Sequence, residues 1–273
     1  MTALDPELIR EAAACASLAV ETVDETASTN RVLMDAPFGR APGAPRLLAA
    51  GRQTAGRGRR GRAWLSPQGR SVAFSISLER RVLSEPPPTA VAVVVGTAVA
   101  GVLSRWAPDV QLKWPNDLQR GGRKLAGILV ESRRSAPAAG AHGDTIERIV
   151  VGIGVNLLAP PQACAIGQPA CGLIDGEMLP ARTAETVIGA LAGAVVPAIE
   201  RFLAEGLAPF VAAWRRFDAL DGRPVTLVDG ERVLASGRAL GLDDSGGLRV
   251  QTADGMRVLR NGEVSLRLRG AAD

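Results

Sequence analysis

Hydrophobic and polar positions follow two different periods along the chain, and together they predict an α+β protein. Strict alternation over 72–79 (VAFSISLE) is typical of a half-buried strand, and buried strands are expected at 46–51 and 145–156. Longer apolar stretches at 89–106 and 182–203 predict buried helices. Further strands are expected at 20–24, 110–113 and 124–132, and further helices at 5–17, 31–35 and 207–220.

The pattern changes after Asp221. Strand-like segments become short and are separated by Asp-Gly and Asn-Gly pairs, which favour tight turns. Closely spaced strands of this kind predict a small β-barrel. We therefore expect a larger domain over 1–220 and a barrel over 221–273. The strands expected in the barrel are 224–228, 232–242, 247–252, 256–260 and 263–268.

Composition narrows the class of protein. The 273 residues carry a net charge of only +4, which suits anionic ligands without indicating nucleic-acid binding. Cys15, Cys164 and Cys171 show no C-x-x-C spacing, so we expect neither a disulfide framework nor a structural metal site. The longest uncharged apolar run, 89–104, is too short for a bilayer core of ~30 Å. The N-terminus (MTALDPELIR) is not a signal peptide, so a cytoplasmic protein without membrane contact is expected.

A glycine- and arginine-rich segment, GRGRRGRAW at 56–64, carries the most chemical information. Its glycines fit G-x-G-x-x-G, but Pro67 and Gly69 follow where a dinucleotide-binding turn would open a helix. Its arginines offer forked donors to a carboxylate or phosphate, and its glycines let the backbone approach an anion. A solvated basic loop or a nucleic-acid-binding arm is the alternative interpretation.

Three further segments carry candidate chemistry. In KWPND (113–117), Lys113 could hold a phosphate and Asp117 could position an amine, although turn-forming residues alone explain the segment. KLAGILVE (124–131) starts an apolar strand with a lysine, and GIGVN (152–156) places two glycines on one strand face. Those glycines could leave a slot for a flat ligand or allow tight packing. The one histidine, His142, lies in a Gly/Ala-rich loop, which argues against a Ser-His-Asp mechanism.

Together these segments resemble the signature motifs of bacterial biotin–protein ligases, the biotin–[acetyl-CoA-carboxylase] ligases. The resemblance runs from about residue 20 to the C-terminus and includes Ser28-Thr29-Asn30, Gln53 and GEVSLR at 262–267. It implies a class II synthetase-like mixed β-sheet catalytic domain flanked by helices, followed by an SH3-like barrel. It further implies that biotin and MgATP form biotinyl-5′-AMP and pyrophosphate. A lysine of the biotin carboxyl carrier protein of acetyl-CoA carboxylase then receives the biotin.

The resemblance also assigns site residues by position. It gives catalytic roles to Lys124, Lys113, Arg57 and Asp117. Biotin would be bound by Ser28, Thr29, Asn30, Gln53, Gly56, Arg57, Gly58, Arg59, Lys124, Gly127, Gly152 and Gly154. ATP would be bound by Arg59, Arg62, Trp64, Lys113, Asn116, Asn156 and Arg267.

Two alternatives share part of this pattern. A lipoate ligase or octanoyl transferase has the same fold, but the first would not be expected to show GRGRRGR. The second would need a cysteine near the KLAG strand, and none lies there. About 20 residues precede the region of resemblance, too few for a winged helix-turn-helix, so a ligase without repressor function or nucleic-acid binding is expected. A monomer or weak homodimer is expected.

Overall fold

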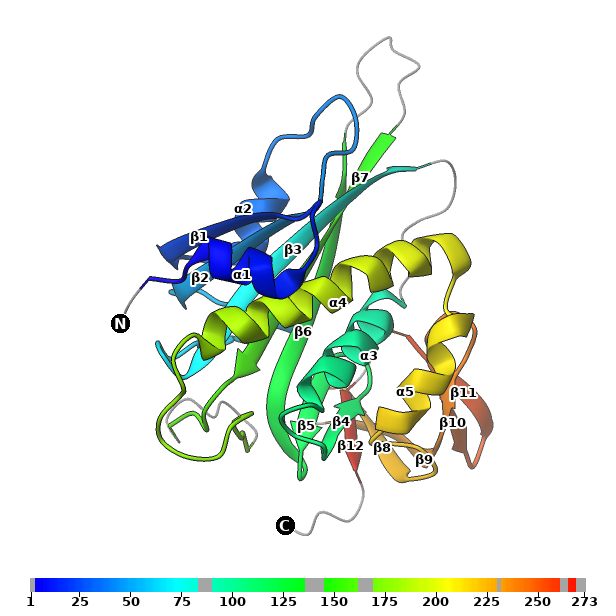
Figure 1. Cartoon of the computed structure of the whole chain (residues 1–273). Coiled ribbons are helices and arrows are strands. Elements are labelled where there is room, and N and C mark those ends of the chain that lie inside the picture. Colours follow the sequence, from blue (N-terminus) through cyan, green and yellow to red (C-terminus); the bar gives the residue numbers. More distant parts are fainter. Residues whose placement is uncertain are drawn as a thin grey trace.

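A computed structural model of the chain describes residues 3–82, 90–135, 145–161, 169–229, 232–260 and 265–268. Of residues 229 and 265–268 it describes only the backbone. The described residues form one seven-stranded sheet and one five-stranded sheet, with helices packed mainly on one face of the larger sheet (Figure 1). This arrangement confirms the predicted α+β class. His142 and Cys164 lie outside the described residues.

The larger sheet is mixed, with strand order β1-β2-β3-β7-β6-β5-β4. β1 and β2 run parallel, and every other neighbouring pair is antiparallel. The four-residue strand β5 was not expected from the sequence, because 110–113 and 124–132 were the strands expected there, around a turn that contains Asp117. The strands are β1 (Ala19–Thr26), β2 (Arg46–Gln53), β3 (Ser71–Val82), β4 (Val110–Lys113), β5 (Asp117–Arg120), β6 (Arg123–Arg134) and β7 (Thr145–Asn156).

Three helices cover one face of this sheet and form the main hydrophobic core (Figure 1). α4 is long and apolar enough to cross a membrane, but here it packs between α1 and α3 with its apolar residues buried. Gly189 and Gly193 allow this close approach, because a Cβ on either would clash with α1. α1 is shorter than expected, since Ala14 adopts a left-handed conformation and ends it. These helices are α1 (Pro6–Ala13), α3 (Val91–Leu103) and α4 (Thr183–Glu205).

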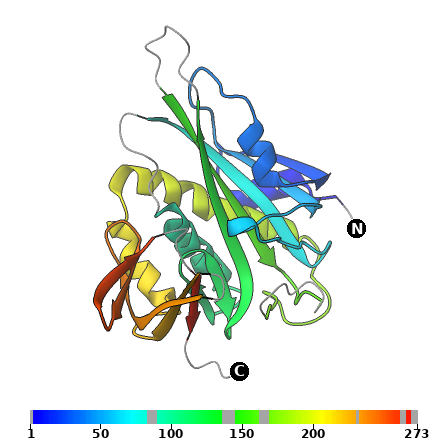
Figure 2. The same ribbon diagram turned by 180° about the vertical axis from the view of Figure 1, so that it is seen from behind.

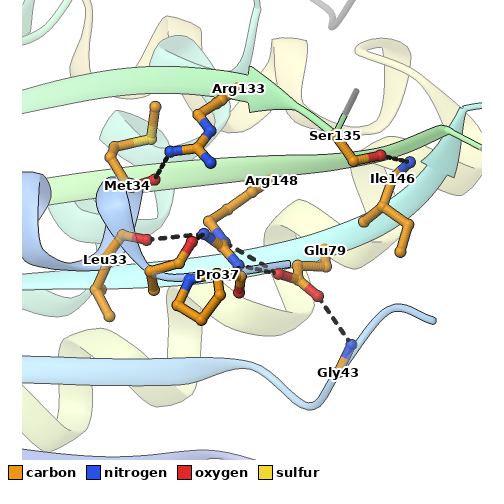
Figure 3. Close-up of polar contacts among 10 residues, drawn as sticks. Leu33, Met34, Pro37, Gly43, Glu79, Arg133, Ser135, Ile146 and Arg148 are labelled. Atoms are coloured by element: carbon orange, nitrogen blue, oxygen red, sulfur yellow. Dashed lines mark hydrogen bonds and ion pairs between the residues drawn. The ribbon is translucent and has the colours of Figure 1, made fainter. Parts of the chain in front are cut away.

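The short α-helix α2 (Thr29–Asp35) lies on the opposite face (Figure 2). Ser28 occupies its N-cap position, but the side chain makes no capping hydrogen bond. The C-terminal end of α2 is held by Arg148, which is only 4% exposed (Figure 3). Its guanidinium donates to the carbonyls of Leu33, Ala36 and Pro37 and pairs with Glu79 at 2.5 Å. Arg148 and Glu79, which belong to the sheet, therefore hold α2 in place, and the residues at the N-terminal end of the helix are held with it.

The five-stranded antiparallel sheet has the order β11-β10-β9-β8-β12. It joins the larger sheet through Trp114, whose buried indole N–H donates to the Gly246 carbonyl at 3.0 Å. Between the sheets the chain forms the short helices η3 (Ala208–Phe210) and α5 (Val211–Phe217). The strands are β8 (Pro224–Asp229), β9 (Arg232–Leu242), β10 (Leu248–Thr252), β11 (Gly255–Leu259) and β12 (Ser265–Leu268).

Replacing Trp114 by phenylalanine tests this junction. We expect the free energy of unfolding to fall by about 1–3 kcal/mol, because the Gly246 carbonyl loses its donor and stays buried. Trp106→Phe is the matched control, since Trp106 is 36% exposed, and it should change the stability much less. Equal midpoints of chemical unfolding for the two variants would show that the indole hydrogen bond does not join the sheets.

Candidate active site

Strand register places small and charged side chains in one row across the larger sheet. Ala73 on β3 pairs with Gly154 on β7, and Gly154 pairs with Gly127 on β6. Gly127 pairs in turn with Asp117 on β5, which faces Lys113 on β4. Directly paired residues point to the same face of a sheet. The row therefore forms a shallow trough of small residues that ends in a carboxylate and an amine.

A cavity of about 810 Å³ lies over this row. Its wall includes the N-terminal end of α2, the arginine-rich segment and the β4–β5 hairpin. Val228 on β8 adds a contribution from the five-stranded sheet. Most residues assigned by resemblance line this cavity, namely Ser28, Thr29, Asn30, Gln53, Arg57, Gly58, Arg59, Arg62, Trp64, Lys113, Asn116, Asp117, Lys124, Gly127, Gly152 and Gly154.

Two assigned residues, Gly56 and Asn156, are not among the described residues of the cavity wall. Gly56 lies at the base of the arginine-rich segment, where a Cβ would clash with the Trp64 carbonyl. Asn156 is buried at the end of β7 and donates to the Lys124 carbonyl at 3.4 Å, so it links β7 to the start of β6. Arg267 belongs to β12, of which only the backbone is described.

The arginine-rich segment folds as a tight loop over the trough. Arg57 and Ala63 form an antiparallel bridge, and the Trp64 N–H donates to the Gly56 carbonyl at 2.9 Å. The tip turns through Arg60 and Gly61, both with positive φ, a conformation that favours glycine. The loop thus depends on few backbone hydrogen bonds, and it brings its arginines to the cavity wall.

Lys124 lies at the centre of the charged end of the cavity. Its Nζ contacts Asp117 Oδ1 at 2.7 Å, with both side chains less than one quarter exposed. The same Nζ lies 5.7 Å from the centre of the Trp64 ring, within the range of a cation–π contact. Restricted solvent access strengthens these interactions relative to surface pairs. The ammonium group is therefore held in place at the edge of the trough.

Arg59 reaches the opposite side of this charged end. Its guanidinium donates to Asn116 Oδ1 at 3.1 Å, while Asn116 Nδ2 donates to the Ile128 carbonyl at 2.8 Å. Burial lowers the pKa of Arg59, and Asp117 acts in the opposite direction. Asn116 therefore links the arginine-rich loop to β6.

Thr29 and Gln53 form the polar end of the cavity. The Gln53 Oε1 atom accepts from the Thr29 backbone N–H at 2.8 Å and from the Thr29 hydroxyl at 3.1 Å. Ser75, fully buried on β3, lies 2.7 Å from the Thr29 hydroxyl and donates to Asn30 Oδ1 at 2.6 Å. Sequence reasoning missed Ser75, because the alternation over 72–79 indicated a strand without showing which polar position faced a ligand.

The slot expected at the two glycines of β7 is filled by the protein's own side chains. A Cβ at Gly152 would clash with the Asn30 amide, and one at Gly154 would clash with the Trp64 indole. The indole Nε1 is buried with no hydrogen-bond partner in the described structure. The glycines therefore serve close side-chain packing, and Trp64 covers the part of the trough where a flat ligand was expected.

The amino-acid composition contains a further signal, the scarcity of lysine. Lys113 and Lys124 are the only lysines among 32 basic residues, and both line the cavity. A chain that otherwise uses arginine for positive charge keeps its two flexible primary amines at this site. No three histidine, cysteine or acidic side chains are grouped like metal ligands among the described residues.

Two family models match the chain. Residues 23–156 match the Biotin/lipoate A/B protein ligase family, and residues 222–267 match the Biotin protein ligase C terminal domain. The first match covers the arginine-rich loop, the β4–β5 hairpin and both glycine-bearing strands. The fold and site thus define a ligase of the biotin and lipoate class.

Individual relatives narrow the class further. A biotin–[acetyl-CoA-carboxylase] ligase of Paracoccus denitrificans is 34% identical over 80% of this chain and 88% of its own length. The bifunctional ligase/repressor BirA of Escherichia coli K12 is 34% identical over 88% of this chain and 71% of its own length. A biotin protein ligase of Aquifex aeolicus, solved with biotin and ATP, has a TM-score of 0.69 and 26% identity over 92% of this chain and 99% of its own. The chain belongs to the biotin protein ligase family.

Proposed function

We propose that the chain uses the cavity to join biotin to AMP and then transfers biotin to a carrier lysine. The observation that carries this proposal is the arrangement of the cavity, in which Thr29 and Gln53 line a polar end and Lys124, Lys113 and Arg59 line a cationic end. A ligand with a polar ring at one end and a carboxylate at the other would extend along this axis. The membership of the biotin protein ligase family supports biotin over lipoate as that ligand.

The first step requires two anions to meet. A carboxylate oxygen of biotin attacks the α-phosphorus of ATP, the bond to the bridging oxygen breaks, and pyrophosphate leaves. Two unit charges 4 Å apart repel by ~4 kcal/mol at an effective dielectric constant near 20. Lys124, Lys113 and the loop arginines would offset this repulsion and the charge that develops at the α-phosphorus.

The second step transfers the acyl group. The amine of the carrier lysine attacks the carbonyl carbon of the mixed anhydride, an amide bond forms, and AMP leaves. The amine must lose a proton, and Asp117 is the carboxylate that lines the described cavity. A biotin carboxyl carrier protein of acetyl-CoA carboxylase is the carrier we expect.

Mg²⁺ would neutralise part of the phosphate charge when it binds with ATP. Among the described cavity residues Asp117 alone carries a carboxylate, and it already pairs with Lys124. Magnesium ions often keep several water ligands and bind through substrate phosphates. We therefore expect phosphate oxygens and water to supply most of its ligands here.

The direct test is biotin-dependent release of pyrophosphate from MgATP, with lipoate and octanoate as parallel acids. Release with biotin alone supports the proposed activation step, and labelling of a carrier domain then tests transfer. Release with lipoate alone would show that the chain activates lipoate instead of biotin, as a lipoate ligase does. No release with any of the three acids would refute the proposal.

Asp117→Asn separates the two steps. If Asp117 accepts the proton of the carrier lysine, transfer from preformed biotinyl-5′-AMP should slow by at least ~10-fold, since general bases contribute rate factors of this size or larger. Activation should slow less, because the amide can still hydrogen-bond Lys124. Single-turnover transfer kinetics give the answer, and a wild-type transfer rate would leave Asp117 only as the partner of Lys124.

Ligand binding should protect the arginine-rich loop. Its backbone is held by a few hydrogen bonds, and its arginines would gain anionic partners once biotin and ATP bind. We expect slower tryptic cleavage after Arg57 to Arg62 in the presence of both ligands. Cleavage within the second sheet, for example after Arg249, is the internal control. Equal cleavage rates with and without ligands would contradict closure of the loop.

A monomeric or weakly dimeric state, the lack of operator binding and a cytoplasmic location stay predictions from the sequence. Weak DNA binding with a steep salt dependence would be the signature of the nucleic-acid alternative.

A further inference from the structure

Glu131 ends the KLAGILVE segment, and nothing in the proposed reaction uses it. It lies on β6, on the same face as Gly127 and Leu129, but it is not part of the cavity wall. Its Oε2 atom accepts a hydrogen bond from Asn30 Nδ2 at 2.9 Å. Asn30 is 3% exposed and lies at the N-terminal end of α2, so this contact joins Glu131 to the polar end of the cavity.

The contact fixes the orientation of the Asn30 amide. The Glu131 carboxylate can only accept hydrogen bonds, and so can the Leu129 carbonyl, which lies 3.4 Å from Asn30 Nδ2. The NH₂ group of Asn30 must therefore face these two oxygens. Its Oδ1 atom must then face Ser75, and the Ser75 hydroxyl donates to it at 2.6 Å.

The orientation of the Asn30 amide also sets the direction of the hydrogen bonds that involve the Ser75 and Thr29 hydroxyls. Because Ser75 has used its only proton, the Thr29 hydroxyl can reach Ser75 Oγ only as a donor, at 2.7 Å. The other acceptor within reach of the Thr29 hydroxyl is Gln53 Oε1 at 3.1 Å, which is also a protein atom. Either way the Thr29 proton points into the protein, so Thr29 Oγ1 offers only lone pairs to the cavity.

Gln53, unlike Thr29, presents hydrogen-bond donors to the cavity. Its Oε1 atom accepts the Thr29 backbone N–H at 2.8 Å, so turning the amide round would place its NH₂ group against that donor. Its NH₂ group therefore supplies the donors at this end of the cavity. The two side chains together present one acceptor and one donor to a bound molecule.

We propose that Glu131 is a positioning residue that sets this direction of hydrogen bonding, and that the result selects a ligand carrying an N–H beside a C=O. A cyclic urea has this pair, whereas the dithiolane ring of lipoate has neither group. The inference rests on the proposed function, because it assigns the polar end of the cavity to the ureido ring of biotin.

Calorimetric binding of biotin in the absence of ATP tests Glu131 separately from catalysis. Glu131→Met removes the closer acceptor and should weaken biotin binding by about tenfold or more, since Asn30 Nδ2 keeps only the Leu129 carbonyl, at 3.4 Å, as an acceptor. Glu131→Gln keeps an acceptor oxygen and should bind within about threefold of wild type, because the order of donors survives. Glu25→Met is the matched control, an exposed carboxylate on β1 outside the cavity wall, and should bind biotin like wild type.

The same variants are compared on biotin methylated at both ureido nitrogens. Wild type should reject this analogue strongly, because Thr29 meets methyl groups instead of N–H donors. Glu131→Met should lose at least half of that discrimination on a logarithmic scale, and so should Ser75→Ala, which breaks the same chain of bonds at another link. Thermal melting identifies any variant that fails to fold. If Glu131→Met or Ser75→Ala fails in this way, the other variant tests whether this chain of hydrogen bonds sets the discrimination.

The outcomes separate the two claims. If wild type binds biotin and Glu131→Met binds it equally well with unchanged discrimination, the role of Glu131 is refuted and the proposed function stands. If wild type does not bind biotin at all, the proposed function fails and the role of Glu131 fails with it.

Discussion

Lys124→Ala is expected to slow formation of biotinyl-5′-AMP by ~10²–10³-fold, the loss typical of removing one preorganised donor from a developing anion. Lys124 is suited to this role because Asp117 and the Trp64 ring hold its ammonium group at the edge of the trough. Alanine also removes the cation that contacts Asp117 at 2.7 Å, so more of the Asp117 negative charge acts where an anion must bind. Pyrophosphate release under saturating biotin and ATP measures the effect.

Lys124→Arg is the matched control, because it keeps the charge and changes only its shape. A guanidinium fork is longer and planar, so it should recover part of the rate without reaching wild type. If alanine and arginine both kept the wild-type rate, Lys124 would have no role in activation, and Lys113 would become the leading candidate. If both lost activity equally, the position of the amine would matter more than its charge.

Local patterns sufficed to predict most elements of the fold, since the long apolar runs over 89–106 and 182–203 are typical of buried helices. The strand at 72–79 is not half-buried as expected, because its polar positions Ser75 and Ser77 are buried as well, with α2 on one face of the sheet and α4 on the other. The strand β5 was not predicted, although β4, which is equally short, was. β5 has four residues and follows a Trp-Pro-Asn sequence, so turn chemistry dominated its pattern. Pairing with β4 and β6 makes it a strand, and that pairing is a tertiary effect that no window of the sequence contains.

The candidate site was predictable as a set of segments but not as an arrangement. Lys113, Asp117 and Gly127 form a row because of strand register, which the sequence does not specify. Trp64 was assigned to the nucleotide side of the site, and the structure places its ring against Gly154. Glu131 and Asn30 are 101 residues apart in the chain, so their contact has no local signal. The restriction of lysine to two positions was visible in the sequence and would have indicated both cavity amines.

Arg148→Ala is expected to lower the free energy of unfolding by about 3–5 kcal/mol, the cost of breaking a buried ion pair from one side. The substitution leaves Glu79, whose side chain is 13% exposed, without its closest cation. It also removes the donor to the carbonyls of Leu33, Ala36 and Pro37, at the end of α2 and just beyond it (Figure 3). The lost guanidinium lies 4.4 Å from the centre of the Phe38 ring. Chemical denaturation measures the change.

Arg133→Ala is the matched control for this prediction. Arg133 also lies near the Phe38 ring, at 5.1 Å, and also donates to a carbonyl of α2, that of Met34, but it is exposed. Its loss should cost no more than about 1 kcal/mol, because water replaces the lost partner. Equal losses for the two variants would show that burial of Arg148 is not the source of its effect. Since Arg148 also fixes α2, the folded fraction of Arg148→Ala should bind biotin more weakly, whereas Arg133→Ala should bind it like wild type. That difference would connect the buried pair between β3 and β7 to the Thr29 and Asn30 end of the cavity.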